Sequence, residues 1–79
     1  MYTVYILRCK DGSLYTGITT DLPRRLAQHK AGTASRYTRA RGADRIVYTE
    51  PRAHRGLALR REAEIKGMTK RQKINLAGL

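Results

Sequence analysis

The chain has 79 residues, with 17 Lys and Arg against 6 Asp and Glu and a formal net charge of +11. A chain this short buries too little surface for two hydrophobic cores, so we expect one domain over residues 1–79. The charge indicates a polyanionic partner, because a surface built for solubility alone carries a net charge of only about 2 to 8. No apolar run approaches the roughly 18 residues that cross a bilayer, which argues against a transmembrane helix.

Other features of the sequence indicate the class of binding partner and the cellular compartment. Nucleic acid is favoured over a membrane surface, because the basic segment 57–73 has no aromatic anchor. The opening residues "MYTVYILRCKDG" lack the basic leader and cleavage site of a signal peptide, so we expect a cytoplasmic protein. Cys9 has no second cysteine with which to form an internal disulfide. One cysteine and two distant histidines also predict that the protein binds no zinc.

The first two apolar runs, "TVYILRC" and "SLYTGIT", predict a β-hairpin because they are rich in β-branched and aromatic residues. A three-residue loop over 10–12 places Tyr5 opposite Gly17 and on the same side of the sheet as Tyr15. A two-residue Asp-Gly loop would place the two tyrosines on opposite sides. The longer loop is favoured because it also gathers an apolar layer on the other face, consisting of Val4, Ile6, Leu14 and Ile18.

The rest of the chain predicts helices and one more strand. A helix is expected over residues 22–31, where Gly32 ends it. Either Thr20 or Asp21 can cap its amino end. The following elements are a basic loop over 33–44 with one helical turn, a strand over 45–50 that Pro51 ends, a helix over 54–66, a break at Gly67, and a short helix over 69–76.

Two features of these helices are candidates for chemistry. Arg25 and His29 lie one turn apart, so a cation and an imidazole share a face. Glu62 lies on the side of the 54–66 helix that carries small and apolar residues, whereas Glu64 faces the other way. These two carboxylates therefore cannot form a paired acid site. An ordinary salt bridge is the alternative role for Glu62.

Together these segments resemble the GIY-YIG nuclease superfamily, in particular its small single-domain bacterial branch. The resemblance covers essentially the whole chain and rests on the order and spacing of its pieces, which are "VYI" at 4–6, "YTG" at 15–17, Arg25 with His29, and "RREAEIK" with Glu62. Weaker likenesses are "ASRYTRAR" and "RQKINL". The chain departs from the pattern at Thr3, in place of the signature glycine, and at Thr16, in place of the central isoleucine.

The resemblance implies an α+β fold, in which a small three-stranded antiparallel sheet is flanked by helices. It also implies an endonuclease that hydrolyses phosphodiester bonds with one Mg²⁺ or Mn²⁺ ion, repair or recombination intermediates of DNA being one substrate class. In that picture Tyr5 is the general base, Tyr15 positions water or phosphate, Arg25 holds the scissile phosphate, His29 hydrogen-bonds or relays a proton, and Glu62 holds the metal. Positive charge nearby would favour the phenolate of Tyr5.

Several basic and polar residues are candidates for contacts with the nucleic acid: Arg24, Arg36, Tyr37, Arg39, Arg41, Lys66 and Lys73, with Asn75 as a further candidate. Simpler roles stay open. The two tyrosines of the hairpin could be ordinary strand aromatics, and His29 could interact with the helix dipole. Arg24 is the rival of Arg25 for the phosphate, while His54 is expected to be exposed.

Two other functions stay open besides an enzyme. The same fold and charge suit a non-catalytic protein that binds DNA or structured RNA and uses the cleft for a phosphate. A basic structural partner of the ribosome is the third possibility, based on size and charge. DNA is favoured over RNA, but no residue distinguishes the two.

Overall fold

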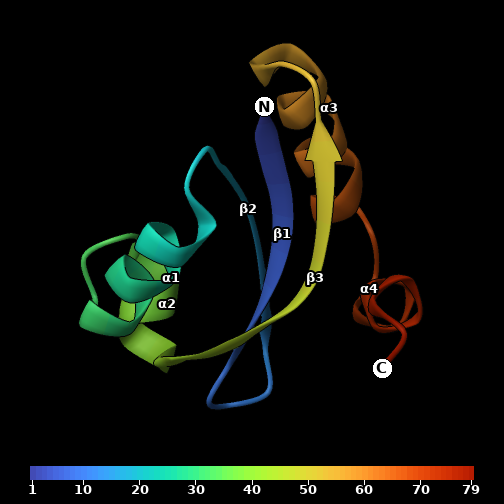
Figure 1. The fold of residues 1–79 in the computed structure, drawn as a ribbon. Coiled ribbons are helices and arrows are strands. Elements are labelled where there is room, and N and C mark those ends of the chain that lie inside the picture. The colour runs from blue at the N-terminus through green and yellow to red at the C-terminus, as the bar shows by residue number, and fades with distance from the viewer.

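The computed structural model describes residues 1–79 as an α+β fold with three strands and four helices (Figure 1). None of these helices is long and apolar enough to cross a membrane. The antiparallel sheet has the order β2-β1-β3, so β1 is its central strand. In chain order the elements are β1 (Tyr2–Cys9), β2 (Leu14–Thr19), α1 (Leu22–Ala31), α2 (Arg36–Arg41), β3 (Ala43–Arg52), α3 (Arg55–Lys66) and α4 (Lys70–Ala77).

The hairpin of β1 and β2 has the register predicted from the three-residue loop. Tyr5 pairs with Gly17 and Leu7 with Tyr15, which puts both tyrosines on one face of the sheet. Gly12 closes the loop with a φ of 85°, a left-handed conformation that favours glycine. The backbone N–H of Cys9 donates to the carbonyl of Ser13 at 2.8 Å.

The two faces of the sheet carry two separate apolar clusters. One is covered by α3 and α4 and is built on Val4, Ile6, Ala58 and Ile65, with Leu14 and Ile18 packed against it, which confirms the predicted apolar layer. The other is covered by α1 and α2 and contains Tyr5, Leu7, Cys9 and Ala43, with Tyr15, Leu22, Leu26 and Tyr37 at its edge. Figure 1 shows the two pairs of helices on opposite sides of the sheet. Tyr5 and Tyr15 therefore face α1 and α2, whereas Tyr2 and Tyr48 pack on the other side of the sheet.

Helix α1 has the bounds predicted from the sequence. Asp21, one of the two predicted caps, accepts a hydrogen bond from the backbone N–H of Arg24. Gly32 ends the helix with a φ of 79°. The predictions for the last two helices are correct to within one residue, since His54 and Thr69 are the N-caps and lie just outside the helices. His54 is exposed, as expected.

The prediction for the middle of the chain is wrong in two respects. Residues 36–41 form a complete short helix, because Ser35 caps it and Gly42 ends it with a φ of 76°. The third strand is also longer than predicted, and Pro51 lies inside it, paired with Thr3. Because β3 is an edge strand, one side of its backbone forms no sheet hydrogen bonds, and a proline there removes none.

Candidate active site

Tyr5 occupies the centre of the candidate site, on the central strand. Its side chain is 1% exposed and lies over the backbone of Gly17 on β2. A Cβ atom at residue 17 would lie 2.5 Å from Oη of Tyr5, a separation that real side chains do not adopt. The missing side chain of Gly17 therefore creates the space into which the Tyr5 hydroxyl projects.

Three rings meet around this hydroxyl. Oη of Tyr5 lies 2.7 Å from Nε2 of His29, which is also 1% exposed. The ring of Tyr15 lies 5.2 Å from the ring of His29 and 6.5 Å from the ring of Tyr5, measured between centroids. The sheet register and one turn of α1 thus bring together two tyrosines and a histidine that are distant in the sequence.

Burial and nearby charge shift the pKa values of Tyr5 and His29. Burial raises the pKa of Tyr5, the Tyr15 side chain and the charge of Glu62 raise it further, and the charge of Arg25 lowers it. Burial is the largest of these effects, so the charge of Arg25 favours the phenolate, as expected, but does not by itself outweigh burial. Burial also lowers the pKa of His29, and Arg25 lowers it further, so the imidazole is neutral at pH 7.

Arg25 and Arg24 lie beside a cavity of about 220 Å³ at the junction of β2 and α1. Thr19, Thr20, Asp21 and Gln28 complete the cavity wall. Arg25 is half-buried, and its charge acts on both Tyr5 and His29. Arg24 is exposed and acts on neither group. Of the two rivals, Arg25 is therefore the one coupled to the tyrosine and the histidine.

Glu62 approaches the site from α3, on the other side of the sheet. Its side chain is 17% exposed and its carboxylate lies 3.4 Å from Nζ of Lys66, so the predicted salt bridge is present. Its negative charge acts on Tyr5, which places the carboxylate within electrostatic range of the Tyr5 hydroxyl. Glu64 is 57% exposed and pairs with Arg61, in agreement with the prediction that the two carboxylates face different ways.

A divalent ion would have Glu62 as its protein carboxylate. No group of three or more His, Cys, Asp and Glu side chains is arranged to hold a metal. One half-buried carboxylate fits Mg²⁺, which often keeps several waters and takes further oxygen ligands from a substrate phosphate. The residues present therefore fit a single ion whose coordination shell is completed by water and by the substrate. They do not fit a structural metal site in which protein side chains supply all the ligands.

Comparison with known proteins shows the family of this chain. The family described as the GIY-YIG catalytic domain matches residues 1–75. The chain belongs to the GIY-YIG family. It is 47% identical over 76 residues to the UPF0213 protein BH0048 of Halalkalibacterium halodurans, covering 96% of this chain and 81% of that protein. It is 45% identical to the UPF0213 protein YhbQ of Escherichia coli, covering 92% of this chain and 73% of that protein.

The GIY-YIG domain also resembles a solved structure of this group. The solution NMR structure of the UPF0213 protein BH0048 from Bacillus halodurans aligns with a TM-score of 0.62 at 46% identity. The alignment covers 99% of this chain and 84% of that one. The predicted fold, a three-stranded antiparallel sheet with flanking helices, is thereby confirmed, and nuclease-type chemistry is the activity that the family suggests.

Not all predicted nucleic-acid contacts of the GIY-YIG domain lie together. Tyr37 and Lys73 line a cavity of about 200 Å³ with Ser13, Leu14 and Lys70, at the hairpin end of β2. The ring of Tyr37 also lies 5.7 Å from that of Tyr15, which connects this cavity to the candidate site. Arg41 stacks on Tyr37 at 3.9 Å and pairs with Asp11.

The remaining candidates lie elsewhere on the GIY-YIG domain. Arg36 and Arg39 line a separate cavity of about 540 Å³ between the end of α1 and the start of α2. Lys66 is engaged with Glu62. Asn75 is exposed on α4. These positions are dispersed over the surface and do not form one continuous groove with Tyr37 and Lys73.

Two residues at the site were not predicted from the sequence. Thr38 is 1% exposed, and its hydroxyl lies 2.8 Å from Nδ1 of His29. Ser35 in turn lies 2.8 Å from the Thr38 hydroxyl. Both belong to the segment that was predicted to be mainly loop. The spacing of a Ser N-cap three residues before a Thr is the sequence signal for this pair, but its contact with His29 requires the tertiary fold.

Proposed function

We propose that this GIY-YIG domain is an endonuclease that hydrolyses phosphodiester bonds of DNA with one Mg²⁺ or Mn²⁺ ion held by Glu62. The observation that carries the proposal is the buried 2.7 Å contact between the Tyr5 hydroxyl and Nε2 of His29. A positive charge on Arg25 and a negative charge on Glu62 act on the same hydroxyl. His29 thus contacts this oxygen directly, while the charges of Arg25 and Glu62 act on it from a distance.

The proposed reaction uses Tyr5 and His29 as a coupled base. The attacking water forms a bond to phosphorus and gives one proton to Oη of Tyr5, while the proton of Tyr5 passes to Nε2 of His29. The bond from phosphorus to the leaving oxygen breaks, and that oxygen takes up a proton from solvent. His29 then releases its extra proton. This arrangement avoids a free phenolate, which the buried position disfavours.

Arg25 and the metal stabilise the charge that develops on the phosphate. The planar guanidinium of Arg25 donates two hydrogen bonds and keeps its charge at any working pH. When bound at Glu62, the divalent ion supplies further positive charge to the phosphate oxygens. The cavities at the two ends of β2, with Arg24 at one and Lys70 and Lys73 at the other, would hold the phosphates on either side of the scissile bond.

A non-catalytic nucleic-acid-binding protein is the second candidate. Its support is the engagement of Glu62 with Lys66, which competes with a metal for the carboxylate. In that case Arg25 and the β2 cavities bind phosphate, and Tyr5 and His29 only stabilise the fold. The two candidates differ in whether the wild type cleaves nucleic acid at all, and in whether that cleavage depends on the Tyr5 hydroxyl.

The test compares purified wild-type protein with Tyr5→Phe and Glu62→Gln on branched, duplex and single-stranded DNA and on matched RNA, with and without Mg²⁺. We expect Tyr5→Phe to lower cleavage by the roughly 10² to 10⁴ typical of a lost general base. Glu62→Gln should abolish Mg²⁺-dependent cleavage and leave binding unchanged or slightly tighter, because a negative charge is removed. Tyr2→Phe serves as a matched control, because it also removes a tyrosine hydroxyl from β1 but Tyr2 packs on the other face of the sheet.

Equal cleavage by all variants would identify a contaminating nuclease and contradict the enzyme proposal. Absence of cleavage by the wild type, together with tight binding by every variant, would favour the binding protein. Cleavage of RNA but not of DNA would correct the substrate class and leave the reaction intact.

A further inference from the structure

His29 lies in a chain of buried hydrogen bonds that continues beyond the candidate site. On one side of the ring, Nε2 contacts Oη of Tyr5 at 2.7 Å, and on the other, Nδ1 contacts Oγ1 of Thr38 at 2.8 Å. Tyr5, His29 and Thr38 are each 1% exposed. Burying a polar group lowers the stability of the fold unless that group has a hydrogen-bond partner. The need for pairing therefore constrains where each proton lies.

The contacts of Thr38 allow an arrangement in which every proton has an acceptor. Its hydroxyl lies 3.4 Å from the backbone carbonyl of Ser35, which can only accept. Oγ of Ser35 lies 2.8 Å from the same hydroxyl and accepts from the backbone N–H of Thr38 at 3.2 Å. If Thr38 donates to the carbonyl, its oxygen is left to accept both from Ser35 Oγ and from Nδ1–H of His29. Every donor then has an acceptor.

The other tautomer leaves the hydrogen-bond chain incomplete. A proton on Nε2 would be donated to Tyr5, whose own hydroxyl proton would then have no partner among the contacts of the buried ring. Thr38 would also have to turn its single proton toward Nδ1 and away from Ser35. The arrangement with Nδ1 protonated satisfies His29, Tyr5 and Thr38 at once.

We propose that Thr38, supported by Ser35, is a positioning residue that holds His29 in the Nδ1–H tautomer and so keeps Nε2 free to accept the proton of Tyr5. The role of that acceptor in catalysis rests on the proposed function, but the tautomer itself does not. Thr38 touches neither substrate nor metal in this arrangement and acts only through His29. Thr38 lies on α2, whereas Tyr5 and His29 lie on β1 and α1. It gives Nδ1 of His29, the ring nitrogen that does not contact Tyr5, a fixed hydrogen-bond partner.

The tautomer can be measured without any substrate. Long-range ¹H–¹⁵N correlation spectra of the full-length labelled protein near pH 7 report which ring nitrogen of each histidine carries the proton. We expect Nδ1 of His29 to be protonated in the wild type and in Thr38→Ser, which keeps the hydroxyl. In Thr38→Val, which has nearly the same shape without the hydroxyl, the Nδ1–H form should no longer dominate. A protonated Nε2 in the wild type, or an unchanged tautomer in Thr38→Val, would overturn the proposal.

Cleavage provides the second readout, on the DNA that the wild type cuts best. We expect Thr38→Val to lower kcat by about 10- to 100-fold, as is typical when the partner of a functional histidine is removed, with unchanged DNA affinity. Thr38→Ser should restore most of the rate. A rate that is the same in Thr38→Val and in Thr38→Ser would contradict the positioning role. If the wild type cuts nothing, the proposed function fails, while the spectra still decide the tautomer.

Discussion

At the scale of single residues, the candidate site depends on polar groups placed where burial makes them costly. Tyr5 and His29 tolerate that position because each satisfies the other at 2.7 Å. Thr16, by contrast, is buried on β2 and its hydroxyl has no hydrogen-bond partner. Leaving such a group unpaired costs about 1 to 3 kcal/mol. Tyr5 and His29 therefore differ from Thr16 in having a hydrogen-bond partner, since all three side chains are buried.

Gly17→Ala tests whether the space above β2 is needed by Tyr5. The added methyl would lie 2.5 Å from the Tyr5 oxygen, so the ring must move and its contact with His29 must weaken. We expect a loss of about 1 to 3 kcal/mol in the free energy of unfolding, measured by urea denaturation, and reduced cleavage. Gly56→Ala is the control, because its nearest neighbour is at 3.5 Å and alanine favours a helix. Equal stability of the two variants would contradict the steric argument.

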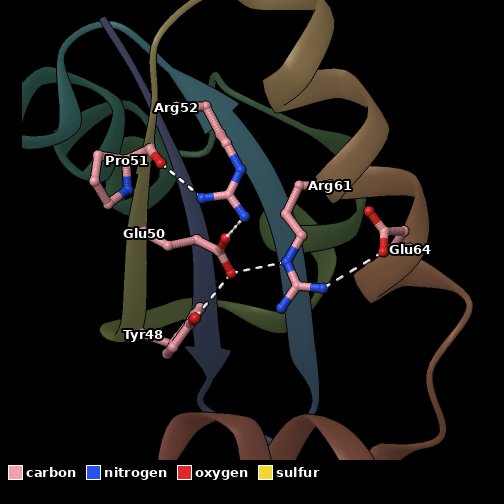
Figure 2. A network of polar contacts seen from close by, with 6 residues as sticks. All are labelled: Tyr48, Glu50, Pro51, Arg52, Arg61 and Glu64. Carbon is pink, nitrogen blue, oxygen red and sulfur yellow. Dashed lines mark hydrogen bonds and ion pairs between the residues drawn. The ribbon is translucent and has the colours of Figure 1, made fainter.

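At the scale of elements, one ion-pair network fixes α3, the helix that carries Glu62, against the sheet. Figure 2 shows Arg52 from β3 and Arg61 from α3 converging on the carboxylate of Glu50, with the hydroxyl of Tyr48 beside them. The contact from Nε of Arg61 is 2.9 Å and that from Tyr48 is 2.8 Å. Arg61 directly precedes Glu62 in the chain, so this network also fixes the rotation of α3 about its axis and with it the direction of the candidate metal ligand.

Glu50→Gln tests this anchoring. The change keeps the shape but removes the charge that compensates two arginines, so we expect about 1 to 3 kcal/mol lower stability, equivalent to a fall in Tm of roughly 4–8 °C per kcal/mol. The control is Glu64→Gln, which removes an exposed partner of Arg61 at 3.7 Å and should cost no more than about 0.5 kcal/mol. Thermal unfolding of both variants measures the difference. Similar losses in the two would show that the buried pair has no special weight.

Because the pKa of Glu50 is lowered in the fold, we expect the protein to lose stability in acid. Burial raises the pKa of Glu50, but hydrogen bonds from Tyr48 and Arg61 and the charges of both arginines together hold it below its ordinary value of 4.5. A carboxylate with a lowered pKa in the fold contributes fully above its unfolded pKa and loses that contribution as the pH falls through the folded value. The difference between wild type and Glu50→Gln should therefore shrink below pH 4.5.

At the scale of the whole molecule, the net charge of +11 is distributed over a body with a radius of gyration of 11.7 Å. Few of the basic residues are neutralised by carboxylates, since the chain has only 6 Asp and Glu. The basic cavities at the two ends of β2 lie on either side of the tyrosines, whereas Arg36 and Arg39 line a separate cavity. Electrostatic attraction should therefore draw a polyanion to the whole surface, while the β2 cavities hold it at the site.

Salt dependence separates these two contributions. Removing a side chain that binds one phosphate should reduce the slope of log affinity against log salt by about 0.9 on duplex DNA and about 0.7 on single strands. We expect such a reduction for Lys70→Ala and for Lys73→Ala, measured by fluorescence anisotropy over a range of salt. Arg60→Ala is the matched control, because Arg60 is exposed on α3 and its replacement also removes one positive charge. Equal slopes in all three variants would argue against a phosphate site at the hairpin end of β2.

The sequence by itself determined the local structure and the list of candidate groups. The hairpin register followed from the three-residue loop and the apolar layer, because one slipped residue would turn every side chain of the strand over. The bounds of α1 followed from Asp21 and Gly32, which cap it. Membership of the GIY-YIG family followed from the order of short segments, and the match over residues 1–75 agrees.

Only the tertiary structure decided how those groups are coupled. It made Pro51 part of β3. A strand tolerates proline mainly if it lies at the edge of the sheet, and the order of the strands decides which strands lie there. The tertiary structure brought the charge of Arg25 within electrostatic range of Tyr5 and His29. It also placed Thr38 against Nδ1 of His29. The two residues belong to different helices, so the spacing of residues within one helix or strand could not predict this contact. Local patterns fix torsions and faces, whereas the protonation and partners of buried groups depend on contacts between distant segments.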